Sequence, residues 1–180
     1  MSDGAFVVRR ATVADASGIA RVHVESSENA YAPLAAEWDA PGVPERIADW
    51  TEWLTVAQGN AQRVDLVAGR DGEIVGFITM GRPRRKDLDV ELEVYVIHVL
   101  PECRGGGVGG ALWTRACEAL RGDSRRAMYV ETFAELRCCS FYAARGGEIV
   151  ERKAATYHGG LVTELVYRWA PGQPNEPAPG

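Results

Sequence analysis

A run of glycines between an apolar stretch and an amphipathic stretch constrains the fold of this chain more than any other feature. The run lies in Pro101–Ala111, where five of the six positions from 105 to 110 are glycine. It follows a predicted strand over residues 90–99 and precedes a predicted helix that ends near Arg121. The first N–H groups of a helix have no partner within the helix, and the helix dipole is positive there. The sequence therefore predicts an anion site, which glycine opens to a bulky phosphate.

Hydrophobic periodicity and turn residues divide the rest of the chain into alternating strands and helices. Strands are expected over residues 6–10, 64–70, 73–81, 90–99, 127–132, 148–156 and 161–169, and helices over about 12–31, 45–58, 109–121 and 135–145. Asp71-Gly72 predicts a hairpin, and the glycine run predicts a β-α-β crossover. These elements predict a mixed α/β sheet with helices on both faces.

Size, composition and charge limit the class of protein. The 180 residues are 46% hydrophobic and 25% charged, which is typical of one soluble domain, here residues 1–170. The tail over 171–180 holds four prolines and is expected to be disordered. No apolar run approaches the ~20 residues that span a bilayer, and the N-terminus lacks a signal-peptide pattern. We therefore expect a cytoplasmic protein that does not associate with membranes.

Two further classes of partner are disfavoured by the same composition. The net charge of −5 argues against a nucleic-acid binder, which is normally basic. The four cysteines lack the spacing of a zinc site, so no metal is expected.

The glycine run also fits the sequence fingerprint of a dinucleotide-binding site. Gly105, Gly107 and Gly110 satisfy G-x-G-x-x-G, and Glu131 follows about twenty residues later. An oxidoreductase is therefore one alternative. Against it, only about 60 residues remain after Gly110 before the tail, and a dinucleotide domain needs several more β-α units. A flexible connector is the other alternative, but glycines cost conformational entropy, so a plain connector should not accumulate them.

The same run also fits R-x-x-G-x-G, through Arg104, Gly107 and Gly109, and other segments extend this match. The matching segments are Val8–Thr12, Glu93–Glu102, Arg104–Ala111 and Phe141–Gly147. Together they resemble the GNAT superfamily, the acyl-CoA-dependent N-acyltransferases, over about 160 of the 180 residues. The resemblance implies a mostly antiparallel α/β (α+β) sheet of about seven strands, flanked by about four helices.

The resemblance also implies that acetyl-CoA is the co-substrate, bound by two neighbouring segments. Backbone amides of the turn would hold its diphosphate, and the preceding strand would pair with its pantetheine arm. The turn positions are Arg104, Gly105, Gly106, Gly107, Val108, Gly109 and Gly110, and the strand positions are Ile97, His98 and Val99. Glu135 and Cys138 replace an asparagine and an alanine that the family often carries, and the missing asparagine is expected to weaken the contact to coenzyme A on that side.

Direct acyl transfer to an amine needs a base and an acid. Glu93 lies eleven residues before Arg104, where some family members carry a glutamate base. The alternative is a carboxylate that faces solvent. Tyr142 matches a tyrosine that protonates the leaving thiolate, and the alternative is a core aromatic beside Phe141. Glu91 is expected on the same strand face as Glu93 and could bind a cation or replace it as base.

These features lead us to expect N-acetyl transfer to a primary amine, on a small molecule or a protein N-terminus. The acidic residues Asp87, Asp89, Glu91 and Glu93 and the negative net charge favour a cationic amine. A homodimer is compatible with the sequence. A non-catalytic acyl-CoA-binding sensor is an alternative, because it would keep the glycine turn without needing the two catalytic candidates.

The acceptor site of the family is shaped by a variable region that here contains several large side chains. Trp38, Trp50 and Trp53 fall in this region, although tryptophans at helical spacing are more often core residues. His23, on the first predicted helix, is interpreted as a core or rim residue.

Overall fold

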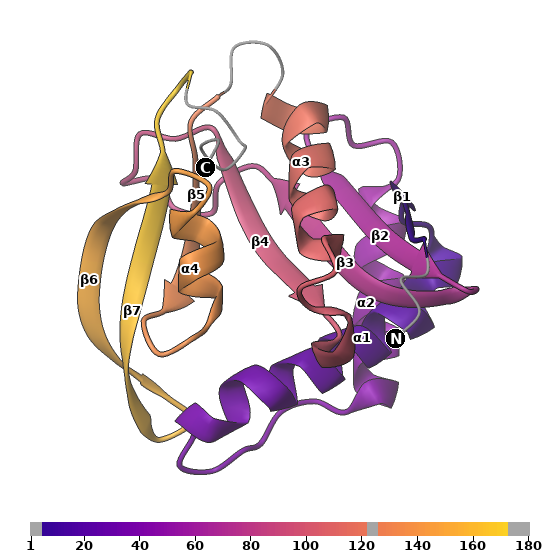
Figure 1. Ribbon diagram of the computed structural model, residues 1–180, viewed down its shortest axis with the longest axis horizontal. Coiled ribbons are helices and arrows are strands. Elements are labelled where there is room, and N and C mark those ends of the chain that lie inside the picture. Colours follow the sequence, from indigo (N-terminus) through magenta and orange to yellow (C-terminus); the bar gives the residue numbers. More distant parts are fainter. Residues whose placement is uncertain (1–4, 122–125, 173–180) are drawn as a thin grey trace.

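The computed structural model describes residues 5–121 and 126–172, and its centre is a seven-stranded sheet (Figure 1). The strand order is β1-β2-β3-β4-β5-β7-β6. The strands are β1 (Val7–Arg10), β2 (Val64–Arg70), β3 (Glu73–Gly81), β4 (Leu92–Val99), β5 (Met128–Phe133), β6 (Glu148–Tyr157) and β7 (Gly160–Trp169). The α-helices in this part of the chain are α1 (Ala16–Tyr31), α2 (Val43–Ala57), α3 (Val108–Arg121) and α4 (Cys138–Ala143).

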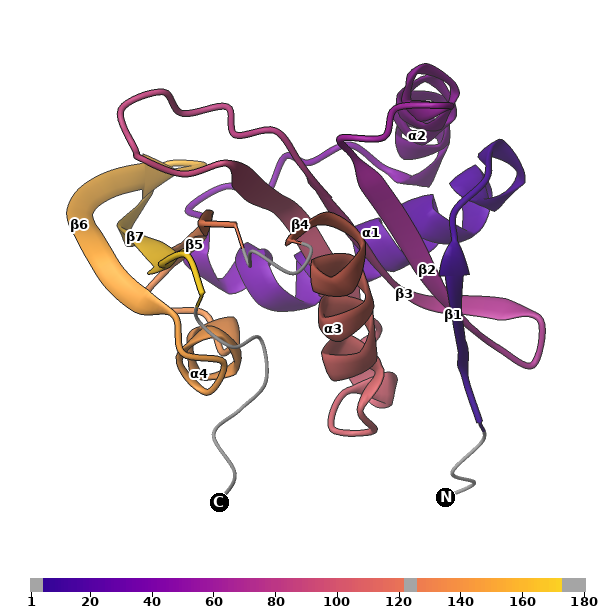
Figure 2. The same cartoon turned by 90° about the horizontal axis from the view of Figure 1, so that it is seen from above.

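Helices cover both faces of the sheet, as predicted. In Figure 2, α3 and α4 lie on one face, and α1 and α2 lie on the other. The alternation of side chains along β3 explains this arrangement. Phe77 packs its ring against Trp50 of α2, whereas a Cβ at the neighbouring Gly76 would meet Leu112 of α3 at 3.2 Å. The sheet core therefore lies between these two helical layers.

The first helix begins where the sequence predicted. The carboxylate of Asp15 accepts the backbone N–H of Thr12 at 2.8 Å and pairs with Arg9 at 2.7 Å. A short 3₁₀ turn over Val13–Asp15 precedes the regular helix. A side chain that satisfies an N–H group at the helix start stabilises that end of the helix.

Three predicted elements have boundaries that differ from the prediction. The fourth helix spans Cys138–Ala143 rather than 135–145, because Glu135 accepts the N–H of Thr163 in β7 at 3.0 Å and its segment forms a turn. The second helix begins at Val43 instead of residue 45, with Pro44 in its first turn, where no N–H is needed. The fourth strand begins at Leu92 rather than residue 90.

One pair of strands in the described sheet is parallel, and it sets the position of the glycine turn. β4 runs parallel to β5, and α3 connects them, while the other pairings are antiparallel. The predicted β-α-β crossover and mostly antiparallel sheet are thus confirmed. A dinucleotide domain needs several parallel units, so that alternative is wrong for the described part of the chain.

Other predictions concern membranes, metals and the tail. Among the described helices, none has the length and apolar character needed to cross a membrane. The side chains described here include no cluster of three or more His, Cys, Asp or Glu arranged to hold a metal ion. The expected disorder of residues 171–180 concerns positions that, from 173 onward, lie outside the described residues.

Candidate active site

The glycine turn presents a row of backbone donors at the start of α3. The N–H groups from Gly105 to Gly110 donate no hydrogen bond to any other described residue, and the first bond of the helix runs from Ala111 to the carbonyl of Gly107, at 3.0 Å. Gly105 and Gly107 have φ of +80° and +81°, a region that favours glycine. A Cβ at either position would meet nothing within 4 Å, so the space above the turn is open.

A cation adds to the positive field of this turn. A Cβ at Gly110, in the first turn of α3, would lie 3.0 Å from the guanidinium of Arg145. That guanidinium stacks 3.6 Å from the centre of the Phe141 ring and donates to the Phe141 carbonyl at 3.1 Å. Among the described carboxylates, none forms an ion pair with it. The donors, the open space and this cation fit a diphosphate.

Arg104 differs from the rest of the predicted turn. Its backbone N–H donates to the carbonyl of Pro101 at 3.3 Å. Its side chain turns back to the carbonyl of Val99 at 3.1 Å and to Asn29 of α1 at 2.7 Å. Arg104 therefore fixes the turn against α1 and β4, and the donors open to an anion begin at Gly105.

β4 and β5 separate soon after they meet. Their described pairing consists of Leu92 with Met128 and Glu93 with Tyr129. On the other side of β4, the register with β3 shifts between Thr79, which faces Val96, and Met80, which faces Val94. Tyr95 is the extra residue of this bulge. A bulge bends the strand that carries it, which accounts for the opening between β4 and β5.

The three predicted pantetheine positions present different groups to this opening. Leu100 donates its N–H to Val75 of β3 at 3.0 Å, and antiparallel strands alternate bonded and non-bonded pairs. Ile97 and Val99 therefore direct their backbone polar groups away from β3, although the carbonyl of Val99 already accepts hydrogen bonds from Ser26 of α1 and from Arg104, both at 3.1 Å. His98 uses its backbone for β3. Its side chain faces the α1 side, where its ring lies 5.2 Å from that of His23.

Glu93 is buried, with 1% of its surface exposed, and its carboxylate is surrounded by donors. It accepts hydrogen bonds from the backbone N–H of Arg84 at 2.7 Å and from the hydroxyl of Tyr129 at 2.7 Å. It also forms an ion pair with the Arg84 guanidinium. The interpretation of Glu93 as a carboxylate facing solvent is therefore wrong, and its proposed role as base must include these two partners.

The other predicted acidic residues are spread over separate contacts. Glu91 lies before β4 rather than on the strand face of Glu93, and it accepts the N–H of Ala127 at 3.2 Å. This corrects the expected juxtaposition of the two carboxylates. Asp87 forms an ion pair with Arg85 in the same loop. Neither Glu91 nor Asp87 lines the described cavity on this face of the protein.

Tyr142 lies in α4, on the opposite face of the sheet from Arg84 and the Glu93 carboxylate. It is 4% exposed, and its ring packs against Trp113 of α3 and Tyr167 of β7, at 5.9 and 5.6 Å between ring centres. Burial, with a smaller contribution from Cys138, raises the pKa of the phenol well above its usual value. The phenol therefore keeps its proton at neutral pH. Of the pair, Tyr142 is the ring that belongs to the core, as the alternative interpretation expected, and Phe141 is only partly buried, so the role of Tyr142 as acid stays a prediction.

A cavity of about 770 Å³ lies between the sheet and the α1–α2 layer. It reaches both edges of the strand opening, at Val96 and His98 of β4 and at Glu131 and Thr132 of β5. Its aromatic walls are Tyr31, Trp38, Trp50, Trp53, Tyr95, Phe133 and Tyr157. A molecule in this cavity would meet whatever occupies the opening between the two strands.

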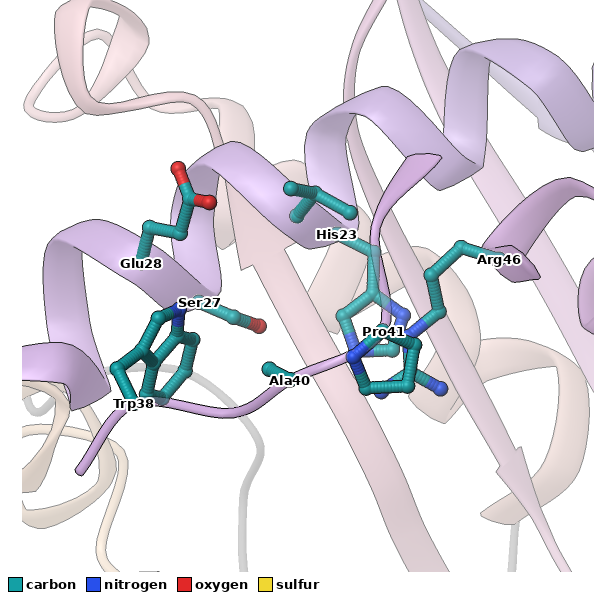
Figure 3. Close-up of a pocket in the computed structure, with 8 residues that line it drawn as sticks. His23, Ser27, Glu28, Trp38, Ala40, Pro41 and Arg46 are labelled. Carbon is teal, nitrogen blue, oxygen red and sulfur yellow. The ribbon is translucent and has the colours of Figure 1, made fainter. Parts of the chain in front are cut away.

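Two histidines form part of this wall in their neutral state. Burial lowers the pKa of His98 to about 3 and that of His23 to about 4. Trp50 donates its indole N–H to Nδ1 of His23 at 3.1 Å. Figure 3 shows the loop carrying Trp38 and Pro41 passing across α1 at His23, where a smaller cavity of about 20 Å³ shares most of its lining with the larger one.

Several residues of this region were not singled out from the sequence. Tyr31, Tyr95 and Tyr157 come from three separate elements. Arg145 lies at a position to which the family resemblance assigns no function. Helical spacing marked Trp50 and Trp53, but it cannot distinguish a core position from a cavity wall. Only the path of the chain brings these rings together.

Comparison with solved structures shows the same fold in several acetyltransferases. The ribosomal-protein-alanine N-acetyltransferase of Brucella melitensis is 20% identical, with a TM-score of 0.72 over 91% of this chain and 99% of that one. The paia N-acetyltransferase of Thermoplasma acidophilum, in complex with coenzyme A, is 18% identical, with a TM-score of 0.65 over 89% and 98%. The yncA protein of Salmonella typhimurium, with its cofactor acetyl-CoA, is 16% identical, with a TM-score of 0.71 over 98% of both chains.

The sequence comparisons define the family. No curated protein sequence matches the chain. The Acetyltransferase (GNAT) family matches residues 23–147, which include the turn, β4 and Tyr142. The fold and the glycine turn thus define an acetyltransferase, and the chain belongs to the GNAT acetyltransferase family. The predicted family, fold class and enzyme class are confirmed.

Proposed function

We propose that this protein transfers the acetyl group of acetyl-CoA directly to a primary amine. The observation that carries the proposal is the continuity of three features. The open donors of Gly105–Gly110 lead to the opening between β4 and β5, and that opening leads to the aromatic cavity. The turn would hold the diphosphate, the backbone of Ile97 and Val99 would bind the pantetheine amides, and the cavity would receive the amine.

The proposed reaction forms one bond and breaks one bond. The ammonium first loses a proton, and its nitrogen then attacks the thioester carbonyl carbon. The C–S bond breaks, the thiolate takes a proton from the phenol of Tyr142, and the second proton released by the nitrogen as the amide forms returns the phenolate to a phenol. Glu93 is proposed as the final acceptor of the ammonium proton. Because Arg84 and Tyr129 cover its carboxylate, the proton must arrive through the Tyr129 hydroxyl or a water.

A non-catalytic acyl-CoA sensor is the second candidate, since it would need the same turn. The cavity beyond the strand opening favours the enzyme, because binding coenzyme A alone requires no second compartment of about 770 Å³.

Two measurements test the proposal together. Acetyl-CoA at ~100 times its Kd should raise the free energy of unfolding by about 2.7 kcal/mol, seen as a higher Tm. NAD(H) at the same concentration should leave Tm unchanged. Thiol release over an amine library should then identify at least one acceptor. No Tm shift with millimolar acetyl-CoA contradicts the whole proposal, whereas a shift without thiol release from any amine favours the sensor.

A further inference from the structure

The charged side chains of the acceptor cavity already have partners. Arg46 pairs with Asp49 at 3.2 Å, and Arg84 pairs with Glu93. The two remaining carboxylates of the wall share their cations with others. Glu131 pairs with Arg85 at 3.3 Å, which also pairs with Asp87 and Glu151, and Glu164 pairs with Lys153 at 2.7 Å, which also lies near Glu151. The described wall thus offers no spare cation for a negatively charged group.

The uncharged part of the wall is mainly aromatic. Tyr31, Phe133 and Tyr157 form a cluster with ring centres 5.0 to 6.2 Å apart, next to the strand opening. Trp38 lies across the cavity from α1, with its ring 5.7 Å from that of His158. Such surfaces bind flat apolar groups through area burial and ring stacking, and they attract a single ammonium through its charge.

One polar group in this wall has no partner. Thr79 of β3 is 2% exposed, and its Oγ1 makes no hydrogen bond with any described residue. The residue lines the cavity opposite Val96, at the bulge of β4 where the strand opening begins. A buried hydroxyl without a partner costs about 1–3 kcal/mol, so its presence calls for a reason other than stability.

We propose that the acceptor is a primary amine joined to a flat apolar body, with its nitrogen bonded to the hydroxyl of Thr79. This inference rests on the proposed function and names the substrate class of the same site. The aromatic wall holds the body. Thr79 holds the nitrogen beside β4, across that strand from the opening where the thioester carbonyl would lie.

A matched series of amines tests the substrate class. The compounds share a four-carbon chain and differ at its far end: 4-phenylbutylamine, n-butylamine, 1,4-diaminobutane and 5-aminopentanoate. We expect kcat/KM for 4-phenylbutylamine to exceed the other three by about tenfold or more, because only phenyl gains from the aromatic wall. If the diamine or the amino acid is the better substrate, the inference is wrong while the proposed function stands. If no amine in any library releases thiol, both fail.

Variants test the two contacts separately. Trp38→Ala should remove most of the preference for 4-phenylbutylamine over n-butylamine, and Val56→Ala, at an exposed site on α2, should keep it. Thr79→Val should lower kcat/KM for the amine about tenfold, while Tm stays the same or rises because an unpartnered hydroxyl is gone. Thr79→Ser should restore activity. Unchanged kcat/KM in Thr79→Val, or an equal loss for both amines in Trp38→Ala, contradicts the proposal.

Discussion

The two catalytic candidates are both buried, but their surroundings suit them to different tasks. The carboxylate of Glu93 is surrounded by the donors of Arg84 and Tyr129, so its charge is compensated in place. Tyr142 is surrounded by aromatic rings, and burial raises the pKa of its phenol. The phenol holds its proton at neutral pH and can donate it when the thiolate forms beside it; because a thiol is the stronger acid, this transfer must be coupled to the loss of a proton from the attacking nitrogen.

The first prediction concerns this phenol. Tyr142→Phe should lower kcat by about 10²-fold or more, with little change in KM for acetyl-CoA, because only proton donation in the transition state is lost. Steady-state thiol release measures both constants. Tyr167→Phe is the matched control, since it removes a hydroxyl from a neighbouring buried ring. A Tyr142→Phe enzyme with wild-type kcat would mean that another group protonates the thiolate.

The second prediction concerns the base. Glu93→Gln should depress the rate most near pH 7, where an amine of pKa near 10 is almost wholly protonated. The rate should recover by roughly tenfold per pH unit toward pH 9–10, as solution supplies the free amine. The pH–rate profile from pH 6 to 10 measures this.

Glu91→Gln is the control for that experiment, because its carboxylate is bonded to Ala127 outside the cavity. It should keep the wild-type profile. If Glu93→Gln also keeps it, the base lies elsewhere, and the neutral side chain of His98 is the next group to replace.

At the scale of elements, the turn before α3 depends on backbone conformation rather than on packing. Gly105 and Gly107 have positive φ, and neither has a neighbour that a Cβ would strike. Glycine is therefore needed for the shape of the turn and for access to its N–H groups.

The third prediction uses this distinction. Gly107→Asp should abolish the Tm increase caused by acetyl-CoA, because a carboxylate would occupy the phosphate position and repel the ligand. Gly59→Asp is a control with nearly the same φ, +77° against +81°, and with equally open surroundings, away from the turn. Both variants should lose similar stability without ligand. A full ligand shift in Gly107→Asp would contradict the anion site.

Element boundaries could be predicted where local chemistry decides them. The first helix, expected from about residue 12, begins where Asp15 accepts the N–H of Thr12, and the β2–β3 hairpin followed from Asp71-Gly72, whose φ values are +52° and +85°. The extent of the fourth helix could not be predicted, because a contact between Glu135 and Thr163 in β7 decides where the helix begins. That contact joins residues 28 positions apart, and periodicity carries no signal for it.

At the scale of the whole molecule, the cofactor side of the site was predictable and the acceptor side was not. The glycine turn and β4 form one continuous segment, so a motif could mark them. The cavity is lined by residues of α1, α2, the loops before α2 and β4, and the strands β3, β4, β5, β6 and β7 (Figure 1). Its rings come together only through tertiary packing, which also buries two histidines.

The fourth prediction follows from those histidines. His98 and His23 have pKa values lowered by burial to about 3 and 4, so the unfolded chain binds more protons than the folded one from about pH 6.5 downward. Their contribution to stability is present above pH 6.5 and is lost as the pH falls toward these values. Asp65, whose pKa burial raises to about 6, acts in the opposite direction.

The contribution of the histidines to stability is therefore measured by comparing how Tm changes with pH in variants and in the wild type. Tm measured from pH 7.5 to 5 should fall less steeply in His98→Gln than in the wild type, because the variant has one fewer buried group to protonate. His158→Gln, at an exposed position, should keep the wild-type slope. Equal slopes in all three proteins would show that His98 titrates normally in the folded state.

The opening between β4 and β5 also bears on how this sheet avoids unwanted association. Unpaired strand edges are templates for aggregation when they face outward. Here two such edges face each other inside the sheet, flanked by β3 and β7, so a strand from another molecule cannot approach them side-on. The outer edges are guarded differently: β1 is only four residues long, and β6 carries Glu151, Arg152 and Lys153 in succession. The facing edges of β4 and β5 can therefore pair with a narrow extended ligand, whereas a strand of another protein cannot reach them.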